Sequence, residues 1–224
     1  MKHPLIPIGQ DIKDLSKNNI MIPTLILFLI HITCYWGMVY TYDDISSNDF
    51  SIAVKNSIKN QLCITLPTIF IFFNSYPITY NNFLISLGCI PILIVTGDIY
   101  FYLSHRPLHS KLLWWFHKTH HKGKVCVAKS LDADALEHFI GNLGSFAIGI
   151  ILLQYLGFIF HIYILYLWVA ISTINTCISH SNGNAPYDNE IHNIHHKLLK
   201  CNYGTGFYIL DRLLGSYREN NKIK

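Results

Sequence analysis

The feature that most constrains this chain is a run of 36 residues, 142–177, that contains no Asp, Glu, Lys or Arg. A single helix of that length would measure about 54 Å, whereas the hydrocarbon core of a bilayer is only ~30 Å thick. The run therefore predicts two short membrane-crossing helices or a re-entrant hairpin, with the bend at Gln154–Gly157 because Gly157 breaks a helix. Two passes return the chain to the side from which it came.

Three earlier segments are also apolar. Residues 20–40 carry no charge and predict a retained membrane helix that begins too late in the chain for a typical signal peptide. Residues 41–56 form a polar connection, 57–80 a shorter apolar segment interrupted by Pro67, and 81–109 a third apolar segment. Charged residues make up 13% of the chain, about half the usual share in soluble domains. We expect an all-α integral membrane bundle of about four transmembrane helices.

Charge and cysteine usage exclude several other classes of protein. The net charge is +4 without a long basic run, so nucleic acid is not an expected partner. The six cysteines are scattered and include no Cys-x-x-Cys pair. This pattern predicts reduced, mostly buried thiols rather than a disulfide framework or a zinc–thiolate site.

Histidines gather in three short stretches. His105 and His109 are spaced i, i+4, and the pattern His-x-x-His-His occurs twice, at 117–121 and at 192–196. At this composition the pattern His-x-x-His-His would arise by chance about 0.04 times per chain. On a helix each spacing puts its rings on one face. Eight imidazoles are too many for one ion and predict a two-metal site, and imidazole suits zinc, copper, iron and nickel.

The remaining histidines divide by position. Spacing alone leaves His180 open as a ligand. We expect His31 and His161, inside apolar segments, and His138 to be non-ligands, and His3 to be a solvated tail residue. Carboxylates near the clusters can fix the tautomers of ligating histidines; the candidates are Asp98, Asp134, Glu137, Asp188 and Glu190.

Three alternatives compete with the two-metal enzyme. The clusters can form a solvated basic face near lipid headgroups. A divalent-metal transporter would place its ligands within the spans near the midplane, whereas these clusters flank the spans among Lys and Arg. A haem-binding electron carrier would need His pairs on facing helices, for which only His31 and His161 lie in apolar segments.

The residues resemble the sterol desaturase/fatty acid hydroxylase superfamily of membrane enzymes. The resemblance runs in the family's order through GDIYFYLSHRPLH (97–109), LLWWFHKTHHKGK (112–124), ISHSNG (178–183) and IHNIHHKLLKCNYGTGFYILDRLLGSY (191–217). It implies a di-iron centre, with O2 as co-substrate and zinc able to replace iron in purified protein. By residue matching it implies nine ligands: His105, His109, His117, His120, His121, His180, His192, His195 and His196.

The resemblance also implies the setting of the site. We expect a polar tail at 1–19, transmembrane helices at 20–94, the enzyme domain at 95–217 with a hairpin at about 142–178, and a tail at 218–224. The histidine-rich cap would face the cytosol at the endoplasmic reticulum membrane. Electrons would come from cytochrome b5 and its NAD(P)H-dependent reductase, since the chain has no His-Pro-Gly-Gly haem motif of its own. Basic residues can dock an acidic donor or lipid headgroups: Arg106, Lys111, Lys118, Lys122 and Lys124.

Within the superfamily, the ending Asn-Tyr-Gly…Asp-Arg and the His-x-x-x-His first box are most similar to sterol C-5 desaturases, with a fatty acyl or sphingoid hydroxylase as the alternative. Two departures from the family pattern bear on the metal site. Asp134-Ala135-Leu136-Glu137 stands where many members have His-Pro before an acidic residue, and Asn184 stands where some members have His.

Overall fold

The computed structural model describes residues 20–43, 48–187 and 190–219. Its described residues form helices and turns with one isolated bridge, between Thr79 and His161, and no strand. Three helical stretches are long and apolar enough to cross a membrane: Met21–Tyr42, Phe83–Leu108 and Ala135–Tyr155. A shorter apolar helix, Ile162–Ile178, follows them. The expected all-α membrane bundle is confirmed.

The first part of the chain is more helical than expected. Helix α2 (Met21–Tyr42) is followed by α3 (Asn48–Asn60), a π-helical turn (Gln61–Thr65) and α4 (Leu66–Ser75). The prediction that 41–56 is only a polar connection is therefore wrong from Asn48 onwards. Pro67 does not interrupt the segment: it lies at the start of α4 directly after the π-helical turn, and the helical course continues through it.

The second part supplies the remaining long helices. Helix α5 (Phe83–Gly88) leads into α6 (Ile90–Leu108), and α8 (Ala135–Glu137), a π-helical turn (His138–Leu143) and α9 (Gly144–Tyr155) run on from one another. Helix α10 (Ile162–Ile178) returns after the bend. The predicted bend is confirmed, since α9 ends at Tyr155 and Gly157 has a φ of +86°, which favours glycine.

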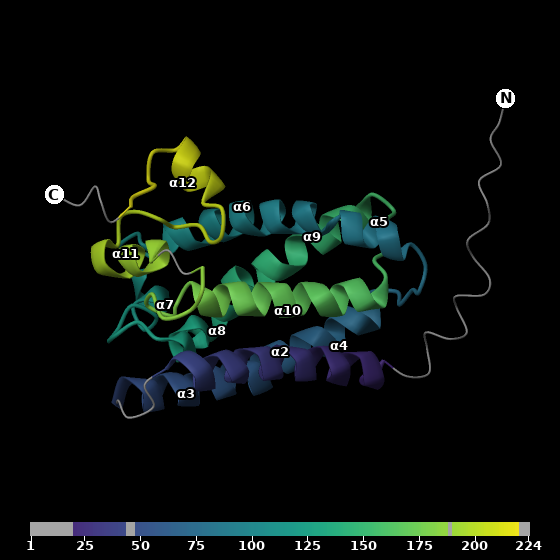
Figure 1. The fold of residues 1–224 in the computed structure, drawn as a ribbon, viewed down its shortest axis with the longest axis horizontal. Coiled ribbons are helices and arrows are strands. Elements are labelled where there is room, and N and C mark those ends of the chain that lie inside the picture. The colour runs from purple at the N-terminus through teal and green to yellow at the C-terminus, as the bar shows by residue number, and fades with distance from the viewer. Residues whose placement is uncertain (1–19, 44–47, 188–189, 220–224) are drawn as a thin grey trace.

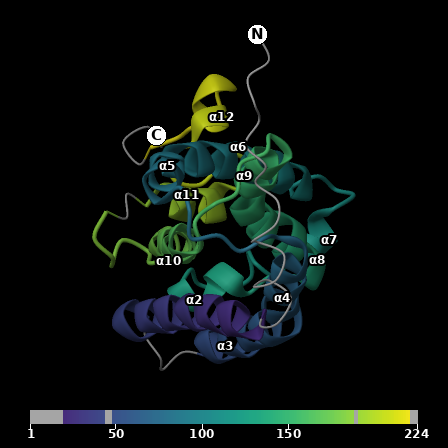
Figure 2. The same cartoon turned by 90° about the vertical axis from the view of Figure 1, so that its right-hand side faces the viewer.

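The long helices pack side by side along the longest axis of the molecule (Figure 1). Helix α10 packs against α2, and α6 packs against α9. The second contact is close: a Cβ on Gly149 would lie 2.8 Å from Leu93 Cδ2, and one on Gly97 would lie 3.1 Å from the Ser145 carbonyl oxygen. Small residues at such positions let membrane helices approach each other. Figure 2 shows the same bundle turned by 90°, with α10 between α2 and α6.

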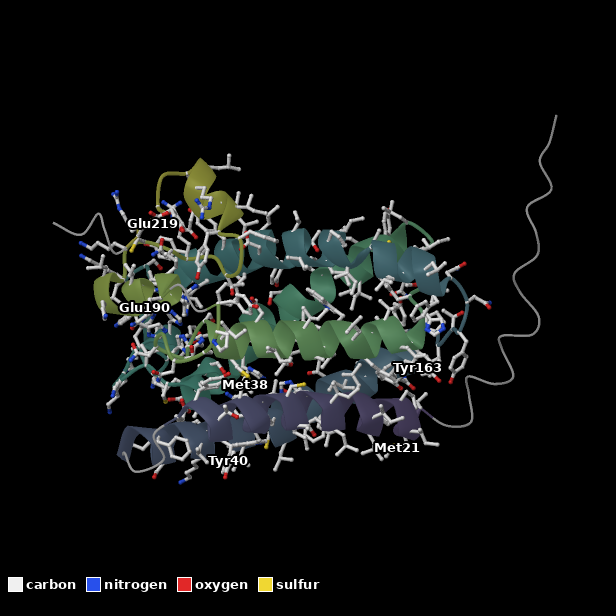
Figure 3. The ribbon with its side chains drawn as sticks, viewed as in Figure 1. Met21, Met38, Tyr40, Tyr163, Glu190 and Glu219 are labelled. Carbon is white, nitrogen blue, oxygen red and sulfur yellow. The ribbon has the colours of Figure 1, made fainter. Side chains whose placement is uncertain are left out.

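The short helices gather at one end of this bundle. Helices α7 (Trp114–His117) and α11 (Ile191–Leu198) lie at the end opposite α5, with α12 (Ile209–Leu213) beside α6 near that end (Figure 1). Nitrogen-bearing side chains gather at the same end, near Glu190, whereas Met21 and Tyr163 lie at the other (Figure 3). The hairpin therefore brings the histidine-bearing segments to the same end, as parity predicted.

Polar side chains from α2 and α3 hold the loop that leads to α8. Asp43 accepts hydrogen bonds from the backbone N–H groups of Val127 (2.6 Å) and Ala128 (2.7 Å). The Tyr35 and Ser57 hydroxyls both donate to the Ala128 carbonyl at 2.8 Å. The amino-terminal helices thus help to position the 3₁₀ helix Val127–Leu131, which precedes Glu137.

Candidate metal centre

The nine histidines predicted as ligands converge into two adjacent groups. In each group, one nitrogen from every ring lies within 4.8 Å of the others. The first group contains His105, His109, His117, His121 and His195, and the second contains His120, His180, His192 and His196. Their ring centroids are also close across the two groups, 4.4 Å apart for His121 and His196. The arrangement has room for two ions side by side.

The local structure differs from a simple helix face. His105 lies in the last turn of α6, and His109 follows directly after that helix. Helix α7 ends at His117, and the chain then continues in turns through His120 and His121. Only α11 carries a full His-x-x-His-His set on a helix, and its rings divide between the groups: His195 joins the first, whereas His192 and His196 join the second. Each doubled pattern therefore contributes to both groups.

Four rings have their tautomer set by a hydrogen bond at Nδ1. His117 Nδ1–H donates to Glu137 Oε1 at 2.7 Å. The other three donate to backbone carbonyls: His105 to Tyr203 (2.7 Å), His195 to Cys201 (2.7 Å) and His180 to Thr176 (3.0 Å). A neutral imidazole that donates through Nδ1 presents a lone pair at Nε2. These four Nε2 lone pairs therefore point into the two groups.

The distances between these nitrogens fit bound cations. His117 Nε2 lies 2.9 Å from His105 Nε2, 3.1 Å from His109 Nε2 and 2.9 Å from His121 Nε2. One nitrogen with a single lone pair cannot form three hydrogen bonds, and two lone pairs at this distance repel each other. Ligands bound about 2.1 Å from one ion lie about 3.0–3.4 Å apart. The first group thus fits the implied metal.

The second group contains buried nitrogens without a protein partner. His120 Nε2 lies 3.3 Å from His180 Nε2. Among the described residues, both ring nitrogens of His192 and the Nε2 of His196 are buried with no hydrogen bond. Since an unpaired buried polar atom is costly and structures rarely contain one, a cation in this group would give these nitrogens a partner.

Among the candidate orienting carboxylates, Glu137 contacts a ligand ring as predicted. Asp134 instead caps α8 by accepting from the Leu136 N–H at 2.9 Å. Asp98 accepts from the backbone of Thr205, Tyr208 and Ile209 and contacts no ligand ring among its hydrogen bonds. Glu190 precedes α11 with a φ of 57°, and Asp188 lies outside the described residues. The three orienting carbonyls were missed because a backbone acceptor has no residue-type signature.

Two buried carboxylates position the carbonyl of Tyr203. Asp211 accepts from the backbone N–H of Tyr203 (2.9 Å) and of Gly204 (2.6 Å), and from the Ser216 hydroxyl (2.7 Å). Asp98 holds the next part of the same loop through three backbone N–H groups. The motif Asn-Tyr-Gly…Asp-Arg therefore acts in this chain by fixing the loop that orients His105.

Changing Asp211 to alanine is expected to lower the unfolding free energy by about 3 kcal/mol or more. Its carboxylate is fully buried and accepts three hydrogen bonds, and charge-assisted bonds contribute about 1.5–3 kcal/mol each. Denaturant unfolding in detergent measures the change. The matched control is Glu219→Ala on the same terminal segment, expected to stay within about 0.5 kcal/mol of wild type. Equal midpoints for D211A and wild type would contradict the assignment.

The histidines expected to be non-ligands lie outside both groups. His138 contacts Thr65 Oγ1 at 2.8 Å and Asn142 Nδ2 at 3.1 Å, and His31 contacts Thr173 Oγ1 at 3.1 Å. His161 caps α10 by accepting from the Tyr163 N–H. His31 contacts α10 at Thr173, 12 residues and about 18 Å along the helix from its cap at His161, so the two rings are too far apart to hold one haem. His3 lies outside the described residues.

Asn184, the position at which some family members have His, is exposed and does not belong to either group. The expectation about the thiols is confirmed in part. The cysteines at 34, 63, 89, 126, 177 and 201 are all free, but only Cys177 and Cys201 are buried and Cys63 is exposed.

Burial makes these imidazoles poor bases. It lowers the pKa of His109 to about 4, and burial together with neighbouring imidazoles lowers the pKa of His121 to about 2. The pKa values of His117, His120, His192, His195 and His196 are lowered for the same two reasons. Neutral imidazole is the form that binds metal, so the site is in its ligating form at neutral pH.

The metal-free protein is expected to lose stability as pH falls below 6.5. The pKa of His109 in the folded protein is about 4, below its ordinary value of 6.5. Between about pH 4 and 6.5 the unfolded chain therefore binds more protons than the folded protein does. The unfolding free energy therefore decreases with falling pH over this window. Denaturant midpoints of chelator-treated protein at pH 7.5 and pH 5.0 measure the effect. A midpoint independent of pH would contradict the buried, neutral histidines.

A cavity of about 380 Å³ lies between the long helices and reaches the histidine end. Its walls are mainly apolar, with Leu27, Ile69 and Trp168 among them. A smaller cavity of about 50 Å³ touches His105, His117, His120, His180 and His192. The two share five polar lining residues, Ser130, Asn142, Ser145, Thr176 and Thr205, which we call the collar. A long apolar ligand in the larger cavity would thus end beside the metal-site rings.

Basic side chains lie on the outside of the same end. Lys111, Lys118, Lys122 and Lys124 are exposed on the segment that carries α7. Arg106 is exposed as well, but its guanidinium donates to the Tyr102 hydroxyl and lies 5.7 Å from the ring centroid of Tyr203. Arg106 therefore also packs against the loop that orients His105.

Comparisons with known proteins bear on the identity of the chain. It is 29% identical over 142 residues to human fatty acid hydroxylase domain-containing protein 2, covering 62% of this chain but only 40% of the relative. It is 27% identical over 203 residues to a putative methylsterol monooxygenase of Dictyostelium discoideum, covering 79% of this chain and 72% of the relative.

A third relative is named for a different lipid. The chain is 32% identical over 139 residues to an ornithine lipid hydroxylase of Rhizobium tropici, covering 55% of this chain and 40% of the relative. No solved structure matches. The profile of the fatty acid hydroxylase family matches residues 90–216, which include every histidine of both groups. The chain belongs to the fatty acid hydroxylase family, as the order of its histidine motifs predicted.

Proposed function

We propose that this chain is a membrane-bound oxidoreductase that binds two iron ions and uses O2 to oxidise an unactivated C–H bond of a lipid. The observation that carries the proposal is the junction of two cavities: an apolar chamber between membrane helices meets nine histidines, six of them buried and three half-buried, whose ring nitrogens converge in two groups. Such iron ions, when bound, would supply the activation of O2 that C–H oxidation requires.

The residues of the chain would have three tasks in this reaction. Glu137 and the carbonyls of Thr176, Cys201 and Tyr203 keep the ligand rings turned toward the ions. The apolar chamber holds the lipid so that one carbon reaches the collar. Burial of the rings excludes water from the reacting end. No histidine is assigned as a general base, because a coordinated imidazole has no free lone pair.

The proposed substrate is a sterol. The alignment with the methylsterol monooxygenase extends over 79% of this chain, well beyond the histidine motifs, which supports a sterol over an acyl chain. Two reactions are therefore in competition: C-5 desaturation, to which the motifs are most similar, and oxidation of a sterol methyl group, for which that relative is named. A hydroxylated acyl or sphingoid lipid is the alternative product.

Lipid profiling of complemented cells tests the proposal. The full chain is expressed in one strain that lacks sterol C-5 desaturase and in another that lacks methylsterol monooxygenase. We expect restored sterol product in one of the two strains and no restoration with the His120→Ala variant. New hydroxylated acyl lipid without a change in sterols would show that the substrate is an acyl or sphingoid lipid rather than a sterol. Absence of any oxidised lipid in either strain would contradict an oxidoreductase.

The proposed electron donors are cytochrome b5 and an NAD(P)H-dependent reductase, at a cytosolic face of the endoplasmic reticulum membrane. Inserting one oxygen atom of O2 into a C–H bond while reducing the other to water consumes two electrons, which these donors would supply. The exposed lysines beside α7 would attract an acidic donor.

Reversing two of these charges is expected to weaken docking of the donor. The double variant Lys118→Glu, Lys122→Glu should raise the KM for cytochrome b5 at least about fivefold at low salt and flatten its dependence on ionic strength. Steady-state oxidation with purified donor measures both. The matched pair Lys118→Gln, Lys122→Gln should change KM less. An unaltered KM and salt dependence in the Glu variant would contradict this docking surface.

A further inference from the structure

Asn142 supplies the only amide side chain of the collar, and one of its two polar atoms is uncommitted. Its Nδ2 lies 3.1 Å from His138 Nδ1, and no hydrogen bond within the described part of the chain engages its Oδ1. The hydroxyls of two other collar residues are already committed as donors: Ser145 donates to the Asn142 carbonyl at 2.8 Å and Thr176 to the Ser172 carbonyl at 2.9 Å. Asn142 borders both the apolar chamber and the small histidine-lined cavity.

A buried chain of hydrogen bonds holds this amide in place. His138 is fully buried, and its Nε2 lies 2.8 Å from the hydroxyl oxygen of Thr65, which is also buried. If Asn142 Nδ2 donates to His138 Nδ1, then His138 Nε2–H donates to Thr65, and Asn142 Oδ1 remains as an acceptor for a ligand. With the opposite tautomer and a flipped amide, the remaining group is a donor.

A hydroxyl group matches the amide in either state, because it both donates and accepts. The rest of the chamber wall is mainly apolar, so a ligand that fits it is a largely hydrocarbon molecule with one polar end at the collar. We propose that Asn142, held in place by His138 and Thr65, binds a hydroxyl group of the lipid next to the carbon that is oxidised. This inference rests on the proposed function and specifies its substrate as a lipid with a hydroxyl close to the reacting carbon.

The position of Asn142 determines which carbon of the lipid would lie near the histidines. Asn142 lies five residues beyond Glu137, which bonds the His117 ring, and it shares the small cavity with that ring. A hydroxyl bound here would therefore hold a neighbouring carbon near the histidines rather than a carbon far along the molecule. In a sterol, this places the ring that carries the hydroxyl at the metal site and the hydrocarbon tail among Leu27, Ile69 and Trp168.

His31 is the rival for the same hydroxyl. It also borders the chamber, and its Nε2 is buried without a hydrogen-bond partner among the described residues. However, His31 pairs with Thr173, about one helical turn deeper along α10 than the collar residue Thr176, and it does not border the small cavity. A hydroxyl at His31 would withdraw the neighbouring carbons from the histidine end. The two sites can be told apart by substitution.

The experiment measures binding rather than turnover, with the metal-loaded full chain in detergent. Tritiated 3β-hydroxysterol is displaced by unlabelled hydroxysterol or by its 3-deoxy analogue. We expect wild type to prefer the hydroxysterol about tenfold, as one well-placed buried hydrogen bond provides. Asn142→Leu should reduce this preference to less than about twofold while binding the deoxy analogue as tightly as wild type does. Asn74→Leu, at an exposed position on α4, is the matched control and should keep the tenfold preference.

Further variants separate the possible outcomes. Asn142→Ala provides the same test if the leucine variant does not fold. His138→Phe should also reduce the preference, because the amide loses the partner that orients it. A tenfold preference that survives in both Asn142 variants, or one lost only in His31→Phe, would overturn the assignment and leave the proposed function standing. Absence of binding by either sterol to wild type would overturn the sterol substrate itself, and the inference with it.

Discussion

Replacing His117 by alanine is expected to abolish one metal site and to reduce lipid oxidation more than about 100-fold. His117 Nε2 lies within 3.1 Å of three other ligand nitrogens, so its loss opens the centre of the first group. Loss of a residue that only hydrogen-bonds to a metal ligand already lowers metal affinity or activity about 10–100-fold. His192→Ala should remove the second ion in the same way, because His192 belongs only to the second group.

Metal content and product formation together test this expectation. Wild type should contain about two ions per chain, and each single variant about one. The matched control is His161→Asn, which changes a histidine at the other end of α10 and keeps a residue that can cap the helix. This control should retain two ions and activity within about threefold of wild type. Two ions in both H117A and H192A would contradict the division into two groups.

Removing the metal is expected to lower the thermal midpoint by more than about 10 °C. Without a cation, His105 and His117 present lone pairs to each other at 2.9 Å, and His121 and His195 have Nε2 atoms 3.2 Å apart. A ligand that binds only the folded state stabilises it by an amount that grows with the logarithm of its affinity, and metal–histidine binding free energies amount to many kcal/mol. In a chain of this size each kcal/mol shifts the midpoint by about 2–4 °C.

Thermal unfolding of chelator-treated protein in detergent measures this shift. Adding back ferrous iron or zinc should restore the midpoint, whereas magnesium should not, because magnesium prefers oxygen ligands. H117A should show a smaller shift on chelation than wild type, since it begins with one ion fewer. Identical midpoints before and after chelation would show that the nitrogens pack stably without a cation.

Periodicity and composition predicted the architecture well where one physical constraint dominated. A charge-free run of 36 residues has few solutions in a bilayer, and the bend at Gly157 followed from its length. The prediction was wrong for residues 48–56, because a polar stretch next to the membrane can be helical as readily as extended. Here α3 turns Ser57 and Asn60 toward the loop before α8, a contact that local sequence does not encode.

The residue types and spacing of the histidines were sufficient to predict that three distant segments meet, because imidazole clusters of this kind have little other use. The sequence by itself also determined which side chains are available as ligands. Only the tertiary structure decided how the rings divide into groups of five and four, and that carbonyls of Thr176, Cys201 and Tyr203 set their tautomers. The physical reason is that a backbone carbonyl is the same at every residue, so its role depends entirely on where folding places it.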